Sequence, residues 1–229
     1  MRPFIVAIDG PAGAGKSTVS KLLARRLGFA LVDTGAIYRC VALMAKRESI
    51  ASDDDARLGE LLGRIHIHFQ VVGEENRVFL DGQDVSSEIR TPEISMGASQ
   101  VSSRPVVRAG LLALQRRLAL EAEKGAILEG RDIGTVVFPD ADAKFFLEAS
   151  SEVRARRRYE ELFQKGVEST LEQVLTDQTQ RDKDDSARAV APLKAAEDAV
   201  RLDSSATPLS EVVQTLETDI LRRLAQRQG

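Results

Sequence analysis

Short apolar runs separated by stretches of helical periodicity organise this 229-residue chain. Apolar runs of a few residues predict strands that are buried on both faces of a parallel sheet. Where apolar residues instead recur every three or four positions, the pattern is typical of helices that cover such a sheet. The alternation of the two predicts an α/β fold, a parallel sheet flanked by helices. The expected strands are residues 4–8, 29–32, 126–129, 144–147 and 200–202.

Start and stop signals place the helices between these strands. Gly28 suits the end of the first helix, Pro105 the start of a central one, and Thr207 with Pro208 the start of the last. Ser150 and Ser151 can cap the helix that follows the strand at 144–147. The expected helices are residues 19–27, 35–47, 54–63 and 105–118, one that follows Ser151, one at 170–182, and one from 208 onward.

One segment has a different pattern. Residues 65–72, IHIHFQVV, alternate between apolar and polar, and are followed by the turn GEEN and the run RVFL. Asp81 and Gly82 then form a hairpin signal before QDV. The segment predicts a small antiparallel, β-rich insert near residues 65–85.

Composition limits the classes of function. Hydrophobic residues make up 43% and charged residues 29%, which is enough for a packed core. The net charge of −3 does not favour a general nucleic-acid or membrane-surface binder. Cys40 is the only cysteine, which excludes an internal disulfide and fits a reducing compartment. We therefore expect a cytoplasmic monomer that binds neither nucleic acid nor membrane.

The stretch after the first strand, GPAGAGKST, satisfies the P-loop pattern. Its glycines let backbone N–H groups curl around phosphate oxygens, and the next helix directs its positive N-terminus at the same anion. Lys16 is expected on the β- and γ-phosphates of ATP, and the Ser17 hydroxyl on Mg²⁺, with Asp9 as a second candidate through a water. The expected ATP-binding residues in this loop are Gly10, Pro11, Ala12, Gly13, Ala14, Gly15, Lys16, Ser17 and Thr18.

Other P-loop classes fit less well. A GTP switch needs N-K-x-D, but the only asparagine, Asn76, precedes Arg77, and no aspartate has a glycine three positions later. We find no second signature of a motor or transporter ATPase. A kinase with a phosphorylated acceptor needs several arginines, because both of its substrates are anionic. Such arginines occur in DTGAIYR, EGRDIG, RARRR and RDKDDSAR.

These motifs, with DVSSEIRTPEI, ASQVS and EGRDIGTVVFPDA, resemble the bacterial cytidylate kinase family in order and over nearly the whole chain. The resemblance implies transfer of the γ-phosphate of ATP to CMP or dCMP, with Mg²⁺ and without a further partner. It also implies three parts. These are a core (1–34, 105–150 and 184–229), a monophosphate-binding region with the β insert (35–104), and a mobile lid (151–183) with its tip at 165–169.

The resemblance also assigns residues. Lys16, Arg131 and Arg39 are expected to be catalytic, and Arg154 and Arg158 of the lid are expected on the ATP phosphates. Thr34 stands where many members have serine, which keeps the hydroxyl and adds a methyl group. The residues expected to bind CMP are Thr34, Arg39, Ser99, Arg108, Arg131, Asp132, Arg181, Asp185 and Arg188.

The residue types agree in part with these roles. Arg181 and Asp185 are four positions apart, so they can share a helix face. Asp132 can accept from the cytosine amino group, where uracil would present a carbonyl to the carboxylate. Two alternatives stay open, namely a P-loop kinase with another acceptor (UMP, AMP or a small metabolite) and a non-catalytic nucleotide-binding module.

Overall fold

The computed structural model describes residues 2–73, 75–164 and 166–228. The chain divides into two compact units. The first comprises Met1–Ala30 and Ala122–Gly229, and the second comprises Leu31–Glu121. The division into core, monophosphate-binding region and lid stays a prediction.

A parallel sheet forms the centre of the first unit. In this sheet β6 (Gly125–Gly130), β1 (Phe4–Asp9), β7 (Ala143–Glu148) and β8 (Val200–Asp203) are neighbours in that order. A fifth strand, β2 (Ala30–Asp33), pairs with β6 in the same sheet and contains the boundary between the units. All residues of β1 and β6 are buried, as their apolar runs predict. The five expected strands and the parallel sheet are therefore confirmed.

The register of this sheet brings several loops to one edge. Asp9, the last residue of β1, is level with Gly130 at the end of β6 and with Phe146 in β7. Since all these strands run in the same direction, the loops after β1, β6 and β7 leave from the same end of the sheet. That end, where the strand order reverses, is where open α/β sheets bind ligands.

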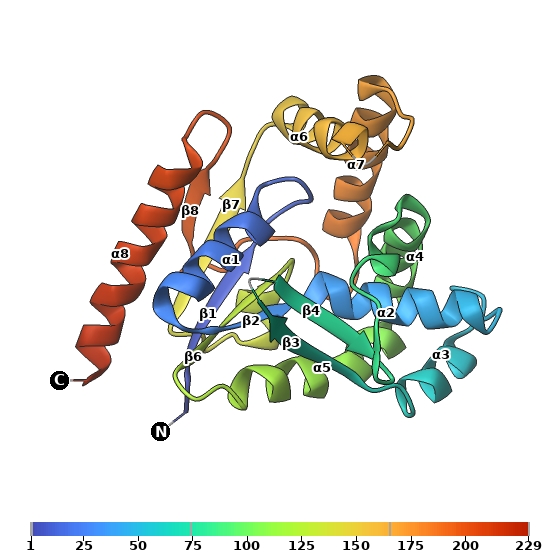
Figure 1. Ribbon diagram of the computed structural model, residues 1–229, viewed down its shortest axis with the longest axis horizontal. Coiled ribbons are helices and arrows are strands. Elements are labelled where there is room, and N and C mark those ends of the chain that lie inside the picture. The colour runs from blue at the N-terminus through green and yellow to red at the C-terminus, as the bar shows by residue number, and fades with distance from the viewer. Residues whose placement is uncertain (1, 74, 165, 229) are drawn as a thin grey trace. The chain divides into compact units, whose positions relative to one another are not determined.

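Among its described residues, the first unit has four α-helices. They are α1 (Lys16–Leu27), α6 (Ser151–Gln164), α7 (Leu171–Ala187) and α8 (Leu209–Gln228). Helix α8 packs against α1 and β7, and α1 follows the loop that leaves β1 (Figure 1). The Ser150 hydroxyl accepts the Val153 N–H at 3.3 Å, which confirms the expected cap of α6. The helix expected at 170–182 is longer than predicted, because it continues to Ala187.

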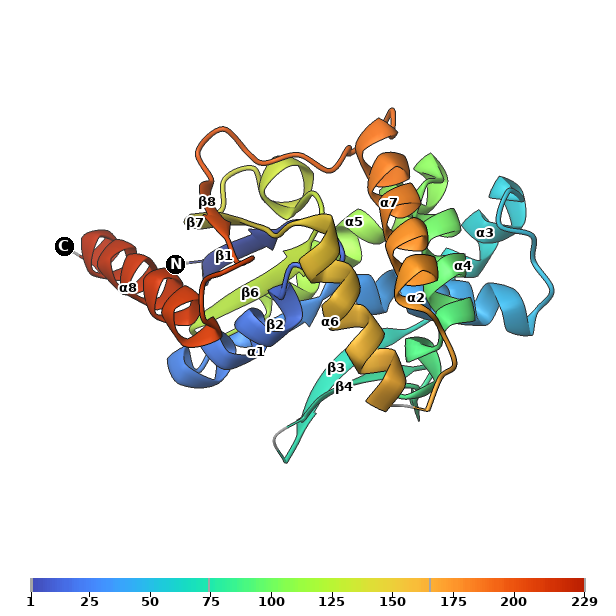
Figure 2. The same ribbon diagram turned by 90° about the horizontal axis from the view of Figure 1, so that it is seen from above.

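Helices α6 and α7 pack against each other and share a small apolar core (Figure 2). Ala155 and Leu162 of α6 and Val174 of α7 are buried in this core. The pair is therefore held together by its own apolar contacts. The predicted lid tip begins at Lys165, which lies outside the described residues.

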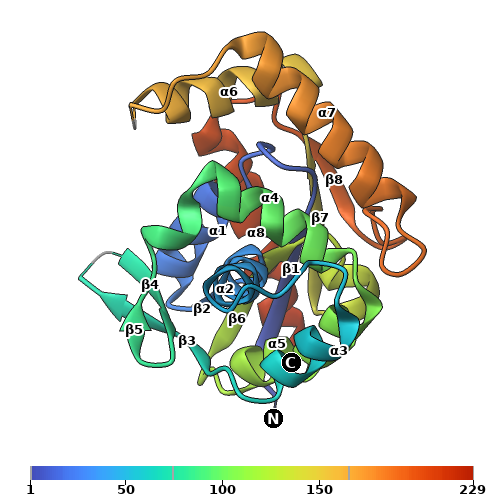
Figure 3. The same ribbon diagram turned by 90° about the vertical axis from the view of Figure 1, so that its right-hand side faces the viewer.

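The second unit combines helices with a small antiparallel sheet. In this sheet the strand order is β3-β4-β5, separate from the parallel sheet (Figure 3). Asp81 and Gly82 take the positive φ angles, 48° and 81°, of the predicted hairpin turn. The β-rich insert is thus confirmed. The elements are α2 (Thr34–Arg47), α3 (Asp55–Leu62), β3 (Ile67–Val72), β4 (Glu75–Leu80), β5 (Gln83–Asp84), α4 (Pro92–Ser102) and α5 (Pro105–Leu120).

Helix α4 and a π-helical turn, η2 (Ile133–Val137), were not among the expected elements. The start of α4 does carry a signal, since the Thr91 hydroxyl accepts the Ile94 N–H and Pro92 is the first helical residue. Within the helix, Ile94, Ala98 and Val101 are buried at helical spacing, a pattern that was overlooked in the sequence. The turn η2 is set by tertiary contacts that begin at Asp9, as described below.

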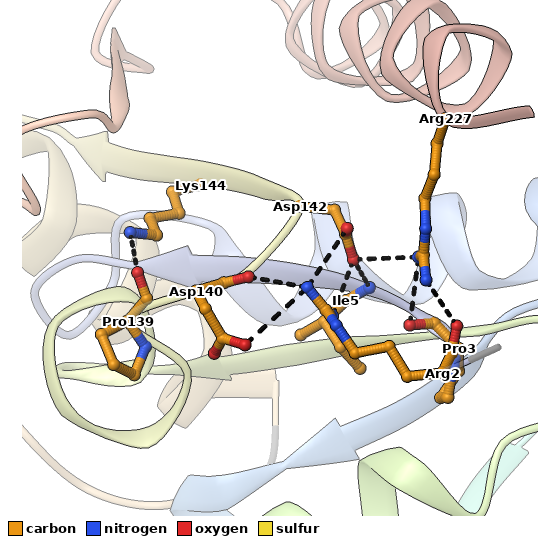
Figure 4. Close-up of polar contacts among 8 residues, drawn as sticks. All are labelled: Arg2, Pro3, Ile5, Pro139, Asp140, Asp142, Lys144 and Arg227. Carbon is orange, nitrogen blue, oxygen red and sulfur yellow. Dashed lines mark hydrogen bonds and ion pairs between the residues drawn. The ribbon is translucent and has the colours of Figure 1, made fainter. Parts of the chain in front are cut away.

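Both chain ends of the first unit are fixed at Asp142 (Figure 4). Its carboxylate accepts the Ile5 N–H at 2.7 Å, an Arg2 Nη1 bond at 3.0 Å and an Arg227 Nη1 bond at 3.3 Å. One side chain before β7 therefore joins the start of β1 to the end of α8. As far as the structure describes the chain, each helix is too short or too polar to span a membrane.

Candidate active site

The P-loop residues form a tight turn between β1 and α1. Gly10 has a φ of 147°, and a Cβ atom there would lie 2.1 Å from the Leu147 carbonyl oxygen. Gly15, with a φ of 89°, caps the start of α1. Both positions need glycine because of the positive φ, and Gly10 also because of the close backbone. All the residues expected to bind ATP in this loop, from Gly10 to Thr18, lie in this turn and in the first turn of α1.

Lys16 is buried at this turn with few compensating charges. Its Nζ donates to the Pro11 carbonyl oxygen at 2.7 Å. Burial, and then the nearby Arg131 guanidinium, lower the pKa of Lys16 to about 7, although Glu129 and Asp9 act in the opposite direction. The ammonium form is therefore held weakly, as expected where an anionic ligand would supply the missing negative charge.

Ser17 contacts Glu129, a residue to which the sequence analysis assigned no role. Its hydroxyl donates to the Glu129 carboxylate at 2.7 Å, and Glu129 is buried near the end of β6. In P-loop proteins Mg²⁺ is held by the loop hydroxyl and by an acid on a second strand. The signal was present in the sequence, since Glu129 comes at the end of the apolar run AIL, in the strand that pairs with β1.

Asp9 orients the loop that follows β6. One carboxylate oxygen accepts the Ile133 N–H and the other the Gly134 N–H, both at 2.8 Å. The side chain is only 3% exposed, and burial raises the pKa of Asp9 to about 6. These two bonds fix the first residues of η2, directly after Arg131 and Asp132. Its role as a water-mediated Mg²⁺ ligand stays a prediction, and the bonds already made give Asp9 a positioning role.

A positive cluster surrounds Asp185. Its carboxylate accepts Arg131 Nε at 2.9 Å and also pairs with Arg188, while Arg181 contributes to its electrostatic environment. Burial alone would raise the pKa of Asp185, but Arg131, Arg188 and Arg181 together hold it below its usual range. Arg181 and Asp185 lie on α7, as their spacing predicts. Three guanidinium groups around one carboxylate leave a net positive site, suited to a phosphate.

Asp132 directly precedes η2 and is buried, with 5% of its surface exposed. It also acts on Asp9 electrostatically, so the two carboxylates lie near one another. Thus Arg131, Asp132, Arg181, Asp185 and Arg188, all predicted to bind CMP, belong to the first unit. The contacts above bring them to the edge of the sheet that also carries Lys16.

The remaining predicted CMP residues belong to the second unit. Thr34 is buried at the start of α2, and Arg39, on the same helix, donates to Asp33 at 3.1 Å. Arg39 Nε is buried and has no hydrogen-bond partner among the described residues. Ser99 is half-buried on α4.

Arg108 lies on α5, where its Nη1 donates to the Ser102 carbonyl oxygen at 3.0 Å. The guanidinium stands over the Tyr38 ring, 5.4 Å from the centroid. Tyr38 was missed by the sequence analysis, although it stands beside Arg39 in DTGAIYR. The aromatic ring fixes Arg108 in a buried position.

The two arginines expected on the ATP phosphates have different surroundings. Arg154 is buried, donates to the Ala12 carbonyl oxygen at 3.0 Å, and pairs with Asp182 at 2.7 Å. Arg158 pairs with Glu161 of its own helix at 2.8 Å. Arg154 is therefore bound to the backbone of the phosphate loop, and direct contacts of either arginine with ATP stay predictions.

Known proteins resemble this chain over most of its length. The family model for cytidylate kinase matches residues 6–222. The chain is 55% identical to cytidylate kinase of Geobacter sp. (strain M21), over 97% of this chain and 94% of that protein. It is 48% identical to cytidylate kinase of Aeromonas salmonicida (strain A449), over 93% and 91%.

Among solved structures, a gluconokinase from Sinorhizobium meliloti 1021 has a TM-score of 0.50 at 17% identity, over 99% of this chain and 96% of that one. This likeness concerns the fold alone. The family model and the identity to the curated relatives extend over nearly the whole length, and the motifs that carry the predicted chemistry fall inside the matched region. The chain belongs to the cytidylate kinase family.

Proposed function

We propose that this protein transfers the γ-phosphate of ATP to CMP or dCMP, giving ADP and CDP or dCDP. The observation that carries the proposal is the electrostatic coupling of Lys16 and Arg131. In the protein alone, burial and then the Arg131 guanidinium disfavour the charged form of Lys16, and its pKa falls to about 7. Two anionic groups, a triphosphate and a monophosphate, would remove this conflict.

We assign the donor to the loop from Gly10 to Thr18. Backbone N–H groups of the loop and the N-terminus of α1 would bind the phosphates, and Lys16 would reach the β- and γ-phosphates. Ser17 and Glu129 fit Mg²⁺, because both offer oxygen ligands, 2.7 Å apart, beside the loop. Such an ion, when bound with ATP, neutralises charge on the β- and γ-phosphates.

We assign the phosphate of the acceptor to four arginines. Arg131, Arg181 and Arg188 supply the positive cluster around Asp185. Arg39 offers a buried Nε that lacks a partner among the described residues, which supports a ligand contact. These guanidinium groups would neutralise the charge on the transferred phosphoryl group and hold the acceptor oxygen in line.

We assign recognition of the base to Asp132, Arg108 and Arg188, with Thr34 near the cytosine edge and Ser99 near the ribose. Asp132 is buried, so its carboxylate needs a hydrogen-bond donor. The cytosine amino group would donate to it, whereas the uracil carbonyl would not, and this lowers the affinity for UMP. This mismatch favours CMP over UMP.

The reaction needs no covalent intermediate and no general base, because the acceptor oxygen is already anionic near neutral pH. What this chain supplies is position and charge. Lys16 and Arg131 stabilise negative charge as it spreads over the transferred group, and Asp9 fixes the loop that carries Arg131. Closure of the lid over both nucleotides would exclude water and prevent hydrolysis of ATP.

A panel of acceptors tests the proposal. ADP release is measured with CMP, dCMP, UMP, AMP and GMP for the wild type, Lys16→Ala and Asp132→Ala. We expect turnover of CMP and dCMP by the wild type, a loss of at least about 10²-fold for Lys16→Ala, and a weaker preference for CMP over UMP in Asp132→Ala.

Each alternative predicts a different result in the same panel. A kinase with another acceptor would turn over UMP, AMP or GMP better than CMP. A nucleotide-binding module would bind ATP without releasing ADP for any acceptor. Wild-type turnover by Lys16→Ala would remove the donor assignment, and unchanged selectivity in Asp132→Ala would move base recognition elsewhere.

A further inference from the structure

Side chains outside the phosphate loop bind three consecutive carbonyl groups of that loop. Arg154 Nη1 donates to the Ala12 oxygen at 3.0 Å, and Arg157 Nη1 to the Gly13 oxygen at 3.4 Å. The Ser204 hydroxyl lies 3.0 Å from the Ala14 oxygen and 3.0 Å from the Glu148 carbonyl oxygen, and its one proton can be donated to either. The two arginines lie on α6, and Ser204 directly follows β8. All these residues belong to the first unit.

These bonds determine where the loop's N–H groups point. In a trans peptide, the carbonyl group and the next N–H point in opposite directions. Because the Ala12 and Ala14 oxygens point outward to Arg154 and Ser204, the N–H groups of Gly13 and Gly15 point away from those side chains. Those are the groups a P-loop turns toward phosphate. The N–H of Ala14 instead closes a turn onto the Pro11 oxygen at 3.4 Å.

The outer side chains are themselves fixed. Arg157 Nη2 donates to the Ser204 carbonyl oxygen at 2.6 Å, and its Nη1 lies 3.2 Å from the Ser204 hydroxyl. Ser204 is 6% exposed, and its N–H donates to the Glu148 carbonyl oxygen at 2.8 Å. A chain of hydrogen bonds therefore runs from the end of β7 through Ser204 and Arg157 to the loop.

Packing at Gly13 shows how closely α6 approaches the loop. Gly13 has a φ of 78°, and a Cβ atom there would stand 3.0 Å from the Arg154 Cβ atom and 3.1 Å from Gln178 Nε2. The outer face of the loop is thus covered by α6 and α7. A nucleotide on the opposite face would meet the loop's N–H groups, while Arg154, Arg157 and Ser204 hold its outer face.

We propose that Arg157 and Ser204, together with Arg154, form an outer collar that holds the phosphate loop in its ATP-binding shape. Arg157 and Ser204 are positioning residues, which act through the carbonyl groups of Gly13 and Ala14. The collar rests on the proposed role of the loop as the donor site. It would provide preorganised dipoles, so that the backbone needs no rearrangement when ATP binds.

Three variants test the collar, namely Ser204→Ala, Arg157→Ala and the double variant. We expect each single variant to raise KM for ATP about five- to tenfold, with KM for CMP within about twofold and the melting temperature nearly unchanged. The double variant should cost little more than Arg157→Ala alone, because both residues hold the same segment. A merely structural role would lower the melting temperature and leave the two KM values in their usual ratio.

Neighbouring residues provide matched controls. Ser205 accepts the Ser150 N–H at 2.9 Å and Arg156 is exposed, so Ser205→Ala and Arg156→Ala should keep the KM for ATP. A wild-type KM for ATP in Ser204→Ala would overturn the collar, as would fully additive effects in the double variant. An effect in Arg157→Ala alone would also overturn it, because it indicates a direct contact of Arg157 with ATP.

The experiments distinguish an error in the proposed donor site from an error in the proposed collar. If Lys16→Ala keeps wild-type turnover, the loop is not the donor site and the collar loses its basis. If Lys16→Ala is inactive while Ser204→Ala behaves as wild type, the donor site stands and only the collar is wrong.

Discussion

At the scale of single residues, the protonation state of the Lys16 amine is expected to change when ATP binds. The pKa of about 7 means that most of the free protein carries a neutral amine at pH 8. A bound triphosphate would favour the ammonium form and return the pKa toward its ordinary range. ATP binding at pH 8 should therefore take up roughly one proton per nucleotide.

Calorimetry of ATP binding at pH 8 measures this uptake, in buffers that differ in ionisation enthalpy. The slope of the binding heat against that enthalpy gives the number of protons. Lys16→Arg is the control, since a guanidinium stays charged at this pH and should give a slope near zero. A slope near zero in the wild type would show that Lys16 is already charged before ATP binds.

At the scale of elements, the strands and most helices could be predicted because their signals are local. The apolar runs of β1 and β6, the Asp81–Gly82 turn and the caps at Gly28 and Ser150 each indicate their element from a few neighbouring residues. The π-helical turn after Asp132 could not be predicted, because the carboxylate that fixes it comes 124 and 125 positions earlier in the chain.

For the candidate site, the sequence indicated which residues take part but not which groups they contact. Motifs gave Lys16 and Arg131, and the spacing of Arg181 and Asp185 gave their common helix. The sequence does not indicate which arginine binds which group. Arg154, whose contact with ATP stays a prediction, also contacts the Ala12 carbonyl oxygen. Arg157, three residues later, was assigned no role but contacts the Gly13 carbonyl oxygen. Such partners depend on how α6 packs on the loop, which no local pattern encodes.

Because Asp9 accepts two N–H groups of η2, Asp9→Asn is expected to lower activity while it leaves the stability of the fold nearly unchanged. Asn at position 9 keeps the shape but replaces one acceptor with an NH₂ group, which leaves one buried N–H unpaired, at a cost of about 1–3 kcal/mol. It also removes the burial penalty of a carboxylate whose pKa is raised from 3.8 to about 6, on the order of 2–3 kcal/mol. The two effects oppose each other and are similar in size.

We therefore expect Asp9→Asn to melt within a few degrees of the wild type at pH 7, with kcat/KM for CMP reduced about tenfold or more, because the loop that carries Arg131 and Asp132 shifts. Since the folded protein binds the Asp9 proton near pH 6 and the unfolded chain near 3.8, the wild type should gain stability relative to the variant as the pH falls through this range. Wild-type kcat/KM in the variant would contradict the positioning role.

At the scale of the whole molecule, the first unit is built from two separate stretches of chain, and Asp142 joins their far ends (Figure 4). Its carboxylate holds Arg2, the Ile5 N–H and Arg227. Truncation to alanine leaves the Ile5 N–H without this acceptor at the start of the central strand. Two arginines also lose a shared partner. Asp142→Ala should lower the free energy of unfolding by about 1–3 kcal/mol.

For a chain of this length, that loss corresponds to a fall in melting temperature of roughly 3–10 °C, measured by thermal unfolding. Asp140→Ala is the matched control, because the Asp140 side chain is 72% exposed and stands 3.9 Å from Arg2, so its ion pair should contribute less than about 1 kcal/mol. Turnover at 25 °C should be unchanged in both variants, since Asp142 lies at the start of β7, opposite the edge of the sheet that carries Lys16. Equal melting temperatures for the two variants would show that the chain ends are held by other contacts.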